Sequence, residues 1–210
     1  NAQASLNISY SSLDEYVAGL RKAIKTRLPE YQLDDDNSEG HQQLNSNILQ
    51  IENEYYSPVR PKRTTESNEK PTDALAQRGI EYVEIRSMDI NPFSAVGITL
   101  EQMHFLDVFL CFCLLKDSPA LVGAESGAAE ANFNKVILQG REPQLTLQHN
   151  GAEHLLSEWG NELFDELEAV ATWLDKAHQT EHYQAVVSEQ RKSIDDPDLT
   201  LSAQFLNELR

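Results

Sequence analysis

The sequence is poor in cysteine, poor in basic residues and without a long apolar run. Its 210 residues hold two cysteines, and 17 lysines and arginines stand against 34 aspartates and glutamates, which gives a formal net charge of −17. A surface this acidic repels a phosphate backbone, so a general nucleic-acid binder is excluded. A local basic pocket for ATP or for a carboxylate substrate remains compatible with it.

The longest apolar run, residues 105–115, is interrupted by Asp107 and is too short to cross a bilayer. The first residues show no basic stretch followed by an apolar one, so we expect neither a membrane segment nor a signal peptide. Cys111 and Cys113 lie two residues apart in a helical pattern, where side chains do not face each other. The sequence therefore predicts two buried thiols in a reducing, cytoplasmic setting.

Helical patterns dominate the second half of the chain. Thr99 and Gln102 form a capping box before a strongly apolar segment, and Gly140 is placed to end the helix that follows. Helices are expected over residues 99–117, 125–140, 157–179, 181–196 and 199–209, with 141–156 irregular.

The first half mixes a helix with strands. Ser12 and Glu15 predict the capped start of a helix that Pro29 stops. An acidic loop over 32–43, a strand over 44–57, a polar loop or active-site flap over 59–78 and a strand over 79–93 are expected to follow. The order of helix, strands and helical bundle is typical of an α+β fold.

The strand within residues 79–93 carries an unusual pair of charges. Side chains alternate along a strand, so Tyr82, Glu84 and Arg86 share one face. The pair Glu84 and Arg86 is either a structural ion pair or two halves of a site. In the second interpretation, the carboxylate ligates a metal such as Mg²⁺, and the guanidinium grips a carboxylate or phosphate.

Two further clusters leave the same choice open. Glu52, Glu54 and Tyr56 alternate along the expected earlier strand, and this face is either exposed to solvent or lies over a cation-bearing cleft. Arg60, Lys62 and Arg63 form the densest basic cluster of the chain, which is either a solvated loop or a phosphate clamp. Residue patterns alone thus predict an α+β domain with a candidate Mg²⁺–carboxylate site.

Four segments closely resemble the proteobacterial glutamate–cysteine ligase family. They are NSNILQIENEYYSPVRPKR (45–63), GIEYVEIRSMDINPFSAVGI (79–98), NKVILQGREPQLTL (134–147) and DPDLTLSAQFL (196–206). The resemblance implies a fold similar to that of glutamine synthetase, in which helices surround a funnel of antiparallel strands. It also implies the ATP- and Mg²⁺-dependent joining of L-glutamate, through γ-glutamyl phosphate, to L-cysteine, the first step of glutathione synthesis.

The resemblance assigns roles to individual residues. Glu84 matches the family's magnesium ligand, and Arg86 matches the arginine that contacts the substrate and the transferred phosphoryl group. Tyr56 matches a tyrosine on the cysteine-binding side. Arg60 and Lys62 are held as candidates for contact with the nucleotide.

Chains of this family are much longer and begin with an acidic strand unit that supplies most other metal ligands. The resemblance therefore implies that residues 1–210 are one fragment of a larger catalytic domain. Residues 1–93 would carry a helix and site strands, and 94–210 would be helical. Alone, the fragment is expected to be inactive and to self-associate through an unpaired sheet edge. The alternatives are a non-catalytic acidic helical interaction module, or a related carboxylate–amine ligase with another amine substrate.

Overall fold

The computed structural model describes residues 3, 6, 8–31, 44–121 and 123–210, so the expected acidic loop over 32–43 lies outside the described residues. The chain forms two compact units, Asn1–Met88 and Asp89–Arg210. Within the described residues there are seven α-helices and two small antiparallel sheets, which confirms the α+β class. None of the helices in this part of the chain is both long and apolar enough to cross a membrane.

In the first unit, helix α1 (Leu13–Ala23) begins where the capping pattern places it. The Ser12 hydroxyl accepts from the Glu15 backbone N–H at 3.2 Å, while the Glu15 carboxylate accepts from the Ser9 hydroxyl at 2.6 Å. The helix ends before Pro29 because the next residues pair with a distant segment: Ile48 N–H donates to Thr26 at 2.8 Å, and Leu28 N–H donates to the carbonyl of residue 46 at 2.9 Å. The apolar face of α1 then builds the core of this unit, which contains Ile8, Tyr16, Val17, Leu20, Ala23, Leu49, Tyr55 and Leu75.

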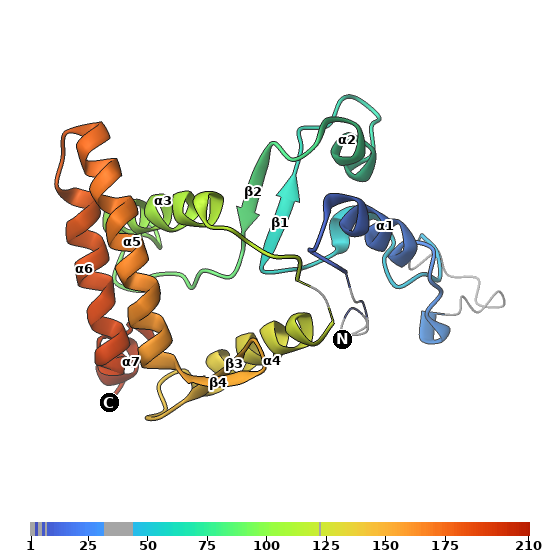
Figure 1. The fold of residues 1–210 in the computed structure, drawn as a ribbon. Helices are drawn as coiled ribbons and strands as arrows, with labels where there is room; N and C mark the ends of the chain where they lie inside the picture. Colours follow the sequence, from blue (N-terminus) through green and yellow to red (C-terminus); the bar gives the residue numbers. More distant parts are fainter. Residues whose placement is uncertain (1–2, 4–5, 7, 32–43, 122) are drawn as a thin grey trace. The chain divides into compact units, whose positions relative to one another are not determined.

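The first sheet is a two-stranded ribbon of β1 (Val59–Lys62) and β2 (Tyr82–Ile85), drawn in cyan and green in Figure 1. The prediction of a strand over 44–57 is wrong, because that segment holds turns and the 3₁₀ helix η3 (Glu52–Glu54). Strand pairing begins only at Val59, the first residue of β1. Pro61 lies inside β1 although proline has no N–H to donate to a strand ladder. Arg86 N–H donates to the Pro58 carbonyl at 2.7 Å, so 58 and 86 are a hydrogen-bonded pair and Pro61 opposite Val83 is not. The missing N–H of Pro61 therefore costs the ladder nothing.

The prediction of a polar loop or flap over 59–78 is also wrong, because the second half of this segment is helix α2 (Pro71–Arg78). Pro71 stands at the first helical position, which suits its fixed φ and missing N–H. The cap comes from a distant residue: the buried Glu52 carboxylate accepts from the Thr72 N–H at 2.9 Å and from its hydroxyl at 2.7 Å. Gly79 ends the helix with φ of 73°, a conformation that favours glycine.

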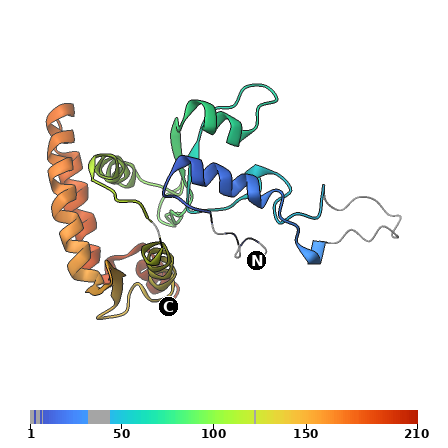
Figure 2. The ribbon, with the colours of Figure 1, turned by 45° about the vertical axis from the view of Figure 1, so that its right-hand side comes forward.

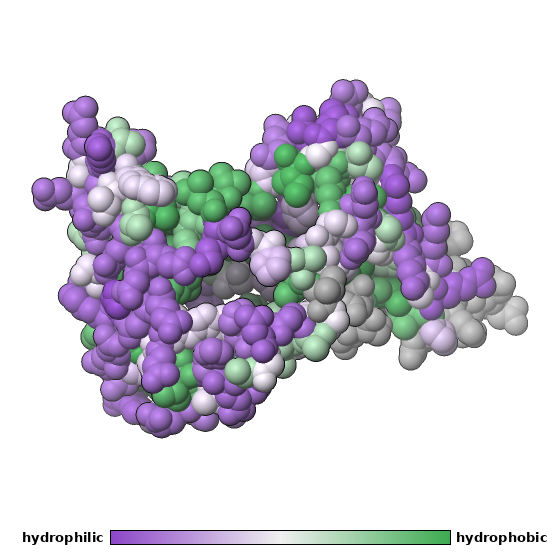
Figure 3. All heavy atoms as spheres, in the orientation of Figure 1, coloured by the Kyte–Doolittle hydropathy of each residue, from purple (hydrophilic) through white to green (hydrophobic). Residues whose placement is uncertain are grey.

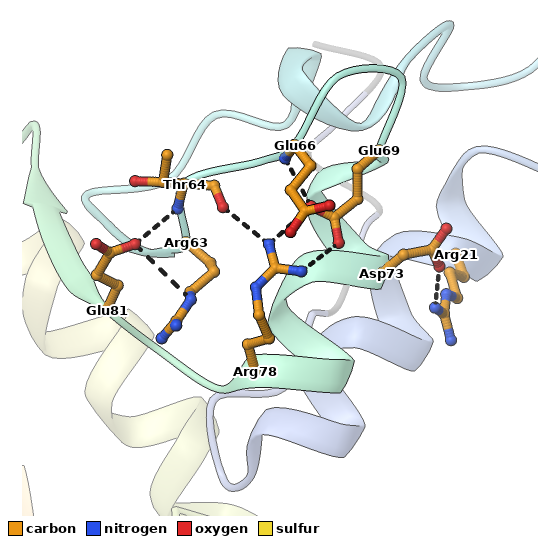
Figure 4. A network of polar contacts seen from close by, with 8 residues as sticks. All are labelled: Arg21, Arg63, Thr64, Glu66, Glu69, Asp73, Arg78 and Glu81. Atoms are coloured by element: carbon orange, nitrogen blue, oxygen red, sulfur yellow. Dashed lines mark hydrogen bonds and ion pairs between the residues drawn. The ribbon is translucent and has the colours of Figure 1, made fainter.

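The stretch between β1 and α2 is tied down by the polar network in Figure 4. Arg78 donates to both carboxylate oxygens of Glu69, at 2.6 and 2.7 Å, and to the Thr64 carbonyl at 3.0 Å. Glu81 accepts from the Thr64 backbone N–H at 2.9 Å and lies 3.7 Å from Arg63. The segment is therefore held by charged side chains at both ends.

We expect this network to loosen in acid. The hydrogen bonds from Arg78 lower the pKa of Glu69 from 4.5 to about 2, so its contribution to stability is full above pH 4.5 and is lost as the pH falls towards 2. Amide hydrogen exchange over residues 63–81 should accelerate in that window, after correction for intrinsic rates. In the Arg78→Gln variant the segment should exchange faster at neutral pH and show a flatter pH dependence. A wild-type profile equal to that of the variant would contradict this role.

The second unit is built on three helices, α3 (Leu100–Leu115), α5 (Leu156–His178) and α6 (His182–Asp195). The Thr99–Gln102 capping box is confirmed in both directions, at 3.3 and 3.0 Å. Figures 1 and 2 show α5 and α6 running side by side, and α3 packs against both. The core that they share consists of Val108, Phe164, Leu167, Val170, Ala171, Tyr183 and Val187.

The remaining elements of this unit are α4 (Ala124–Gln139), a hairpin of β3 (Thr146–His149) and β4 (Ala152–Leu155), and α7 (Leu201–Glu208). The prediction of irregular structure over 141–156 is wrong, because most of this segment forms the β3–β4 hairpin. Its turn residues Asn150 and Gly151 have φ of 50° and 74°, the positive values that a two-residue turn between twisted strands needs. The Asn-Gly pair is therefore a hairpin signal that the sequence itself contains.

The two cysteines are free, as expected, but they are not both buried. Cys111 is half-buried and packs beside the core, whereas Cys113 is exposed. The apolar residues of α3 are spread around the helix and are not gathered on one face. Only a narrow side around Val108 packs against α5 and α6, so apolar residues on the other sides stay exposed. An apolar sequence therefore overstated the burial of this helix.

Asp175 joins α5 to α6 through a buried carboxylate. It accepts from the backbone N–H groups of Tyr183 and Gln184 at 3.0 and 2.9 Å, from the Gln184 amide at 3.0 Å and from the Thr180 hydroxyl at 2.8 Å. Burial opposes ionisation, but these four donors outweigh it and lower the pKa of Asp175 to about 2. One side chain thus caps the start of α6 from the end of α5.

Asp175→Ala is expected to lower the free energy of unfolding by about 2–4 kcal/mol, because a helix cap and the buried donors lose their charged acceptor together. Asp175→Asn should cost less, since one amide oxygen still accepts. Urea unfolding followed by circular dichroism measures both, with Glu162→Ala on the exposed face of α5 as the control. Equal stability of Asp175→Ala and Glu162→Ala would contradict the capping role.

Candidate functional site

The five side chains singled out from the sequence lie on or beside the β1–β2 ribbon. Arg60 stands directly opposite Glu84 in the antiparallel register, and Lys62 opposite Tyr82. Since side chains two apart on a strand share a face, Arg60, Lys62, Glu84 and Arg86 project to one side of the ribbon. Tyr56, just before β1, reaches this group through Arg86, whose guanidinium carbon lies 5.9 Å from the centre of the tyrosine ring.

Glu84 and Arg86 contact each other as an ion pair, with Arg86 Nη2 donating to Glu84 Oε1 at 2.9 Å, a contact that is compatible with both interpretations of the pair. Both side chains keep about a third of their surface exposed, 34% and 35%. The hydrogen bond from Arg86 lowers the pKa of Glu84, so the carboxyl is ionised at neutral pH. The ring of Tyr56 is largely exposed beside them. The pair is therefore accessible, charged and held in one orientation.

The second oxygen of Glu84 has no comparable partner. Oε2 is shielded from solvent and accepts no hydrogen bond within the described residues, and Lys62 Nζ lies 3.6 Å from it. A shielded carboxylate oxygen without a donor is costly, and such an atom commonly has an ion, water or ligand as its partner. An ionised oxygen of this kind is the donor type that Mg²⁺ prefers, so Glu84 fits the role of a metal ligand.

Arg60 is the residue whose position differs most from expectation. It is 4% exposed, which rules out the solvated-loop interpretation for this member of the basic cluster. Its Nη1 donates to the Asn53 carbonyl at 3.4 Å, and its positive charge acts on the hydroxyl of Tyr16. Burial raises the pKa of Tyr16 to about 12 although Arg60 works against the rise, so this tyrosine stays neutral.

The acidic face expected over Glu52, Glu54 and Tyr56 does not exist as such. The segment is not a strand, and both carboxylate oxygens of Glu52 are taken by Thr72. Glu54 Oε2 accepts from the Gln50 backbone N–H at 2.5 Å. The cation-cleft interpretation is therefore wrong for Glu52 and Glu54, while Tyr56 stays beside Arg86.

A cavity of about 300 Å³ opens next to this ribbon within the first unit. Its lining includes the largely apolar side chains of Tyr16, Leu20 and Leu75 and the basic residues Arg60, Lys62 and Arg63. No pattern in the sequence marked this cavity, because its walls come from α1, α2 and β1, which only the fold brings together.

The described residues contain no group of three or more histidine, cysteine, aspartate or glutamate side chains arranged to hold a metal ion. Glu84 on its own can supply one ligand. An Mg²⁺ that needs six oxygen ligands would take the others from phosphates, water or other polypeptide.

Comparison with known sequences decides the family. A sequence model described as glutamate–cysteine ligase matches residues 1–136. This chain belongs to the glutamate–cysteine ligase family. The match includes the whole β1–β2 ribbon and its five candidate site residues.

Curated relatives extend the similarity over the entire chain. The glutamate–cysteine ligase of Pseudoalteromonas translucida is 50% identical over 210 residues, all of this chain and 40% of its own length. That of Sodalis glossinidius is 48% identical over 99% of this chain and 41% of its own length. The chain thus spans about two fifths of the length of the relatives that it matches.

Two solved structures are similar as well. The glutamate–cysteine ligase of Francisella tularensis in complex with AMP matches 98% of this chain and 41% of its own with a TM-score of 0.88 and 39% identity. A bifunctional glutathione synthetase from Pasteurella multocida matches 98% of this chain and 22% of its own with a TM-score of 0.60. At 20% identity, the second likeness concerns the fold alone.

Proposed function

We propose that this chain carries part of the active site of an ATP-dependent ligase that joins the γ-carboxylate of L-glutamate to the amine of L-cysteine. Membership in the family supports the reaction class, and the AMP bound to the Francisella tularensis relative supports the use of a nucleotide. The observation that carries the proposal is the Glu84–Arg86 pair, in which the guanidinium holds one carboxylate oxygen and leaves the other without a donor.

Glu84 is the residue that would hold Mg²⁺, through the carboxylate oxygen that lacks a hydrogen-bond donor. A bound Mg²⁺ would neutralise charge on the phosphate oxygens of ATP. The ionised state of Glu84, maintained by Arg86, suits this role at neutral pH. The further ligands are expected from phosphates and from protein outside this chain.

Arg86 is the proposed catalytic residue. Its planar fork can bind two oxygens of a carboxylate or of a phosphoryl group in transfer, and its contact with Glu84 fixes the direction of the fork. Phosphoryl transfer depends on positioning and on charge stabilisation more than on covalent chemistry of the protein. Arg86 would thus bind L-glutamate and stabilise charge as γ-glutamyl phosphate forms.

Three neighbouring residues are proposed to belong to the same site. Tyr56, against Arg86, would line the side that receives L-cysteine. Arg60 and Lys62, on the same face of the ribbon as Glu84, are proposed to contact ATP phosphates. In the complete enzyme the β1–β2 ribbon would be one part of a larger, funnel-shaped antiparallel sheet.

The exposed apolar surface of helix α4 supports the view that further polypeptide covers this helix in the complete enzyme. Its 16 residues include none that is buried, although Phe133, Ile137 and Leu138 keep 44%, 63% and 82% of their surface exposed. Helix α3 likewise exposes Leu114 and Leu115, and Figure 3 shows apolar side chains gathered over α3 on the face in view. Apolar helix surfaces of this extent are normally covered.

The β1–β2 ribbon also supports the presence of further polypeptide in the complete enzyme. Two strands form a marginal sheet, and within the described residues neither β1 nor β2 pairs with a third strand. We expect strands from the N-terminal part of the family's chain to pair here. In their absence a second copy of this chain would use the same edge, which would appear as self-association. Alone, residues 1–210 should be inactive, because a lone carboxylate and one guanidinium cannot position ATP and two amino acids.

The amine substrate provides the test of this function. This chain would be mixed with the remainder of the Pseudoalteromonas translucida enzyme, and γ-glutamyl products would be identified by mass spectrometry with cysteine, alanine or ammonia as the amine. The proposal predicts a dipeptide of glutamate and cysteine and a strong preference for cysteine. Equal use of another amine would replace it with a related ligase. Two folded, associated pieces that form no product with any amine would favour a non-catalytic module.

A further inference from the structure

Three histidines of the second unit gather where α3, α5 and α6 meet. His104 lies near the start of α3, His178 is the last residue of α5 and His182 is the first residue of α6. The ring of Tyr183 lies beside two of them, with its centre 5.2 Å from that of His104 and 5.7 Å from that of His178. Sequence spacing does not reveal this group, because His104 comes from a separate helix and Gln179, with φ of 56°, ends α5 between the other two. The proposed ligase site gives none of these side chains a role.

His104 and His182 stand at the distance of a metal chelate. Their ring centres are 5.6 Å apart, and the planes of the two rings are inclined by 11°. Metal–nitrogen bonds of about 2.0–2.1 Å place the centres of two imidazoles on one tetrahedral ion about 5 Å apart. Rotation about the bond between Cβ and the ring has broad minima, so both rings can direct a nitrogen to one point without a change in the backbone. A single ion can therefore reach both side chains.

The ring nitrogens of this pair are available. Within the part of the chain that the structure describes, no hydrogen bond occupies a ring nitrogen of His104 or His182, and the bond to the Thr180 hydroxyl comes from the backbone of His182. The hairpin carries a second pair, His149 and His154, whose ring centres are 5.9 Å apart. There, however, the side-chain amide nitrogen of the neighbouring residue 150 lies 3.0 Å from Nε2 of His149. The hairpin pair therefore serves as an internal control.

Two carboxylates of α3 lie near the pair of His104 and His182. Hydrogen bonds from its own backbone and from the Thr99 side chain lower the pKa of Glu101, and the charge of His104 adds to this effect. Burial raises the pKa of Tyr183, and the charge of Asp107 contributes to the rise. Both carboxylates make the surroundings favourable to a cation. They are not counted as ligands, since the described residues hold no group of three or more histidine, cysteine, aspartate or glutamate side chains arranged around one metal ion.

We propose that His104 and His182 are the two protein ligands of an open site for a late first-row divalent ion of the class of Zn²⁺, Ni²⁺ or Cu²⁺. Imidazole nitrogen suits these ions, whereas Mg²⁺ prefers oxygen ligands. Water would fill the remaining positions of the ion. The ion would join the start of α3 to the start of α6, since each helix supplies one ligand. The site shares no residue with the β1–β2 ribbon, so the inference goes beyond the proposed function and does not depend on it.

Titration of Zn²⁺ into the ¹⁵N-labelled chain, without ATP or Mg²⁺, tests the site. The imidazole nitrogen resonances of His104 and His182 should shift together and saturate at one ion per chain, while those of His149 stay in place. His104→Gln and His182→Gln should each weaken binding about tenfold or more, because each removes one of two protein ligands. His149→Gln, the same change in the hairpin pair, should bind like the wild type. Ni²⁺ should reproduce the shifts, and Mg²⁺ should not.

Unfolding in urea with and without Zn²⁺ keeps the test independent of how stable each variant is. An ion that binds the folded chain raises the midpoint of unfolding. Zn²⁺ should therefore raise the midpoint of the wild type and of His149→Gln, but not that of His104→Gln. Absence of a saturable shift at His104 and His182 would overturn the proposal, as would equal affinity of His104→Gln and His149→Gln for Zn²⁺. No catalysis is measured, so either result leaves the ligase activity to its own assay.

Discussion

Replacing Arg86 with lysine in the assembled enzyme is expected to lower kcat about 10²- to 10³-fold, the loss typical when one preorganised donor to a transition state is removed. Lysine keeps the charge but not the planar fork, so it cannot hold Glu84 and a second pair of oxygens at once. The fold should survive the change, because Arg86 is exposed and lies after the last residue of β2. Steady-state release of ADP measures the effect.

The control for this prediction is Arg21→Lys. Arg21 also pairs with a carboxylate in the first unit, that of Asp73, but it lies on α1 away from the ribbon, as Figure 4 shows. We expect that variant to keep its kcat. A rise in KM with kcat unchanged for Arg86→Lys would mean that the residue binds substrate and transition state equally, and would remove it from the chemical step.

The second large effect is expected for Ile137→Asp on α4. Ile137 makes no buried contact in this chain, so its replacement should leave the fold of residues 1–210 unchanged. If α4 packs against the remainder of the enzyme, a carboxylate there would have to be buried without a partner. Association with the companion polypeptide should then weaken about 100-fold or more. Analytical ultracentrifugation of the mixture measures it.

Gln139→Glu supplies the matched control, since it adds the same charge two residues further along an exposed stretch of α4, on another side of the helix. It should associate nearly as the wild type does. Undiminished association of Ile137→Asp would show that α4 is not part of the contact, and the exposed end of α3 around Leu114 would be the next surface to change.

Where local signals determine structure, the sequence was sufficient. The starts of α1 and α3 follow from Ser12 and from the Thr99–Gln102 box, and the pairing of Glu84 with Arg86 follows from the two-residue period of a strand. These features depend on neighbours within four residues. Residues close to one another in the sequence therefore determine these features.

The errors share the opposite cause. Helix α2 was missed because its cap, Glu52, lies 20 residues from Thr72 along the chain. Arg60 is buried and lines the same cavity as Tyr16 of α1, a proximity that no pattern around residue 60 reveals. Pro61 entered a strand because of its register opposite Val83, which the sequence does not display. The Asn150–Gly151 hairpin is the exception, since its signal was local and was overlooked.

The most direct test of the account is ADP release by two separate polypeptides and by their mixture. This chain and the remainder of the Pseudoalteromonas translucida enzyme would each be assayed alone, then together, with ATP, Mg²⁺, L-glutamate and L-cysteine. The account predicts that neither piece releases ADP, that the mixture does so only with L-glutamate, and that Glu84→Gln in this chain abolishes the release. Undiminished release in the Glu84→Gln mixture would contradict the claim that the β1–β2 ribbon forms part of the active site.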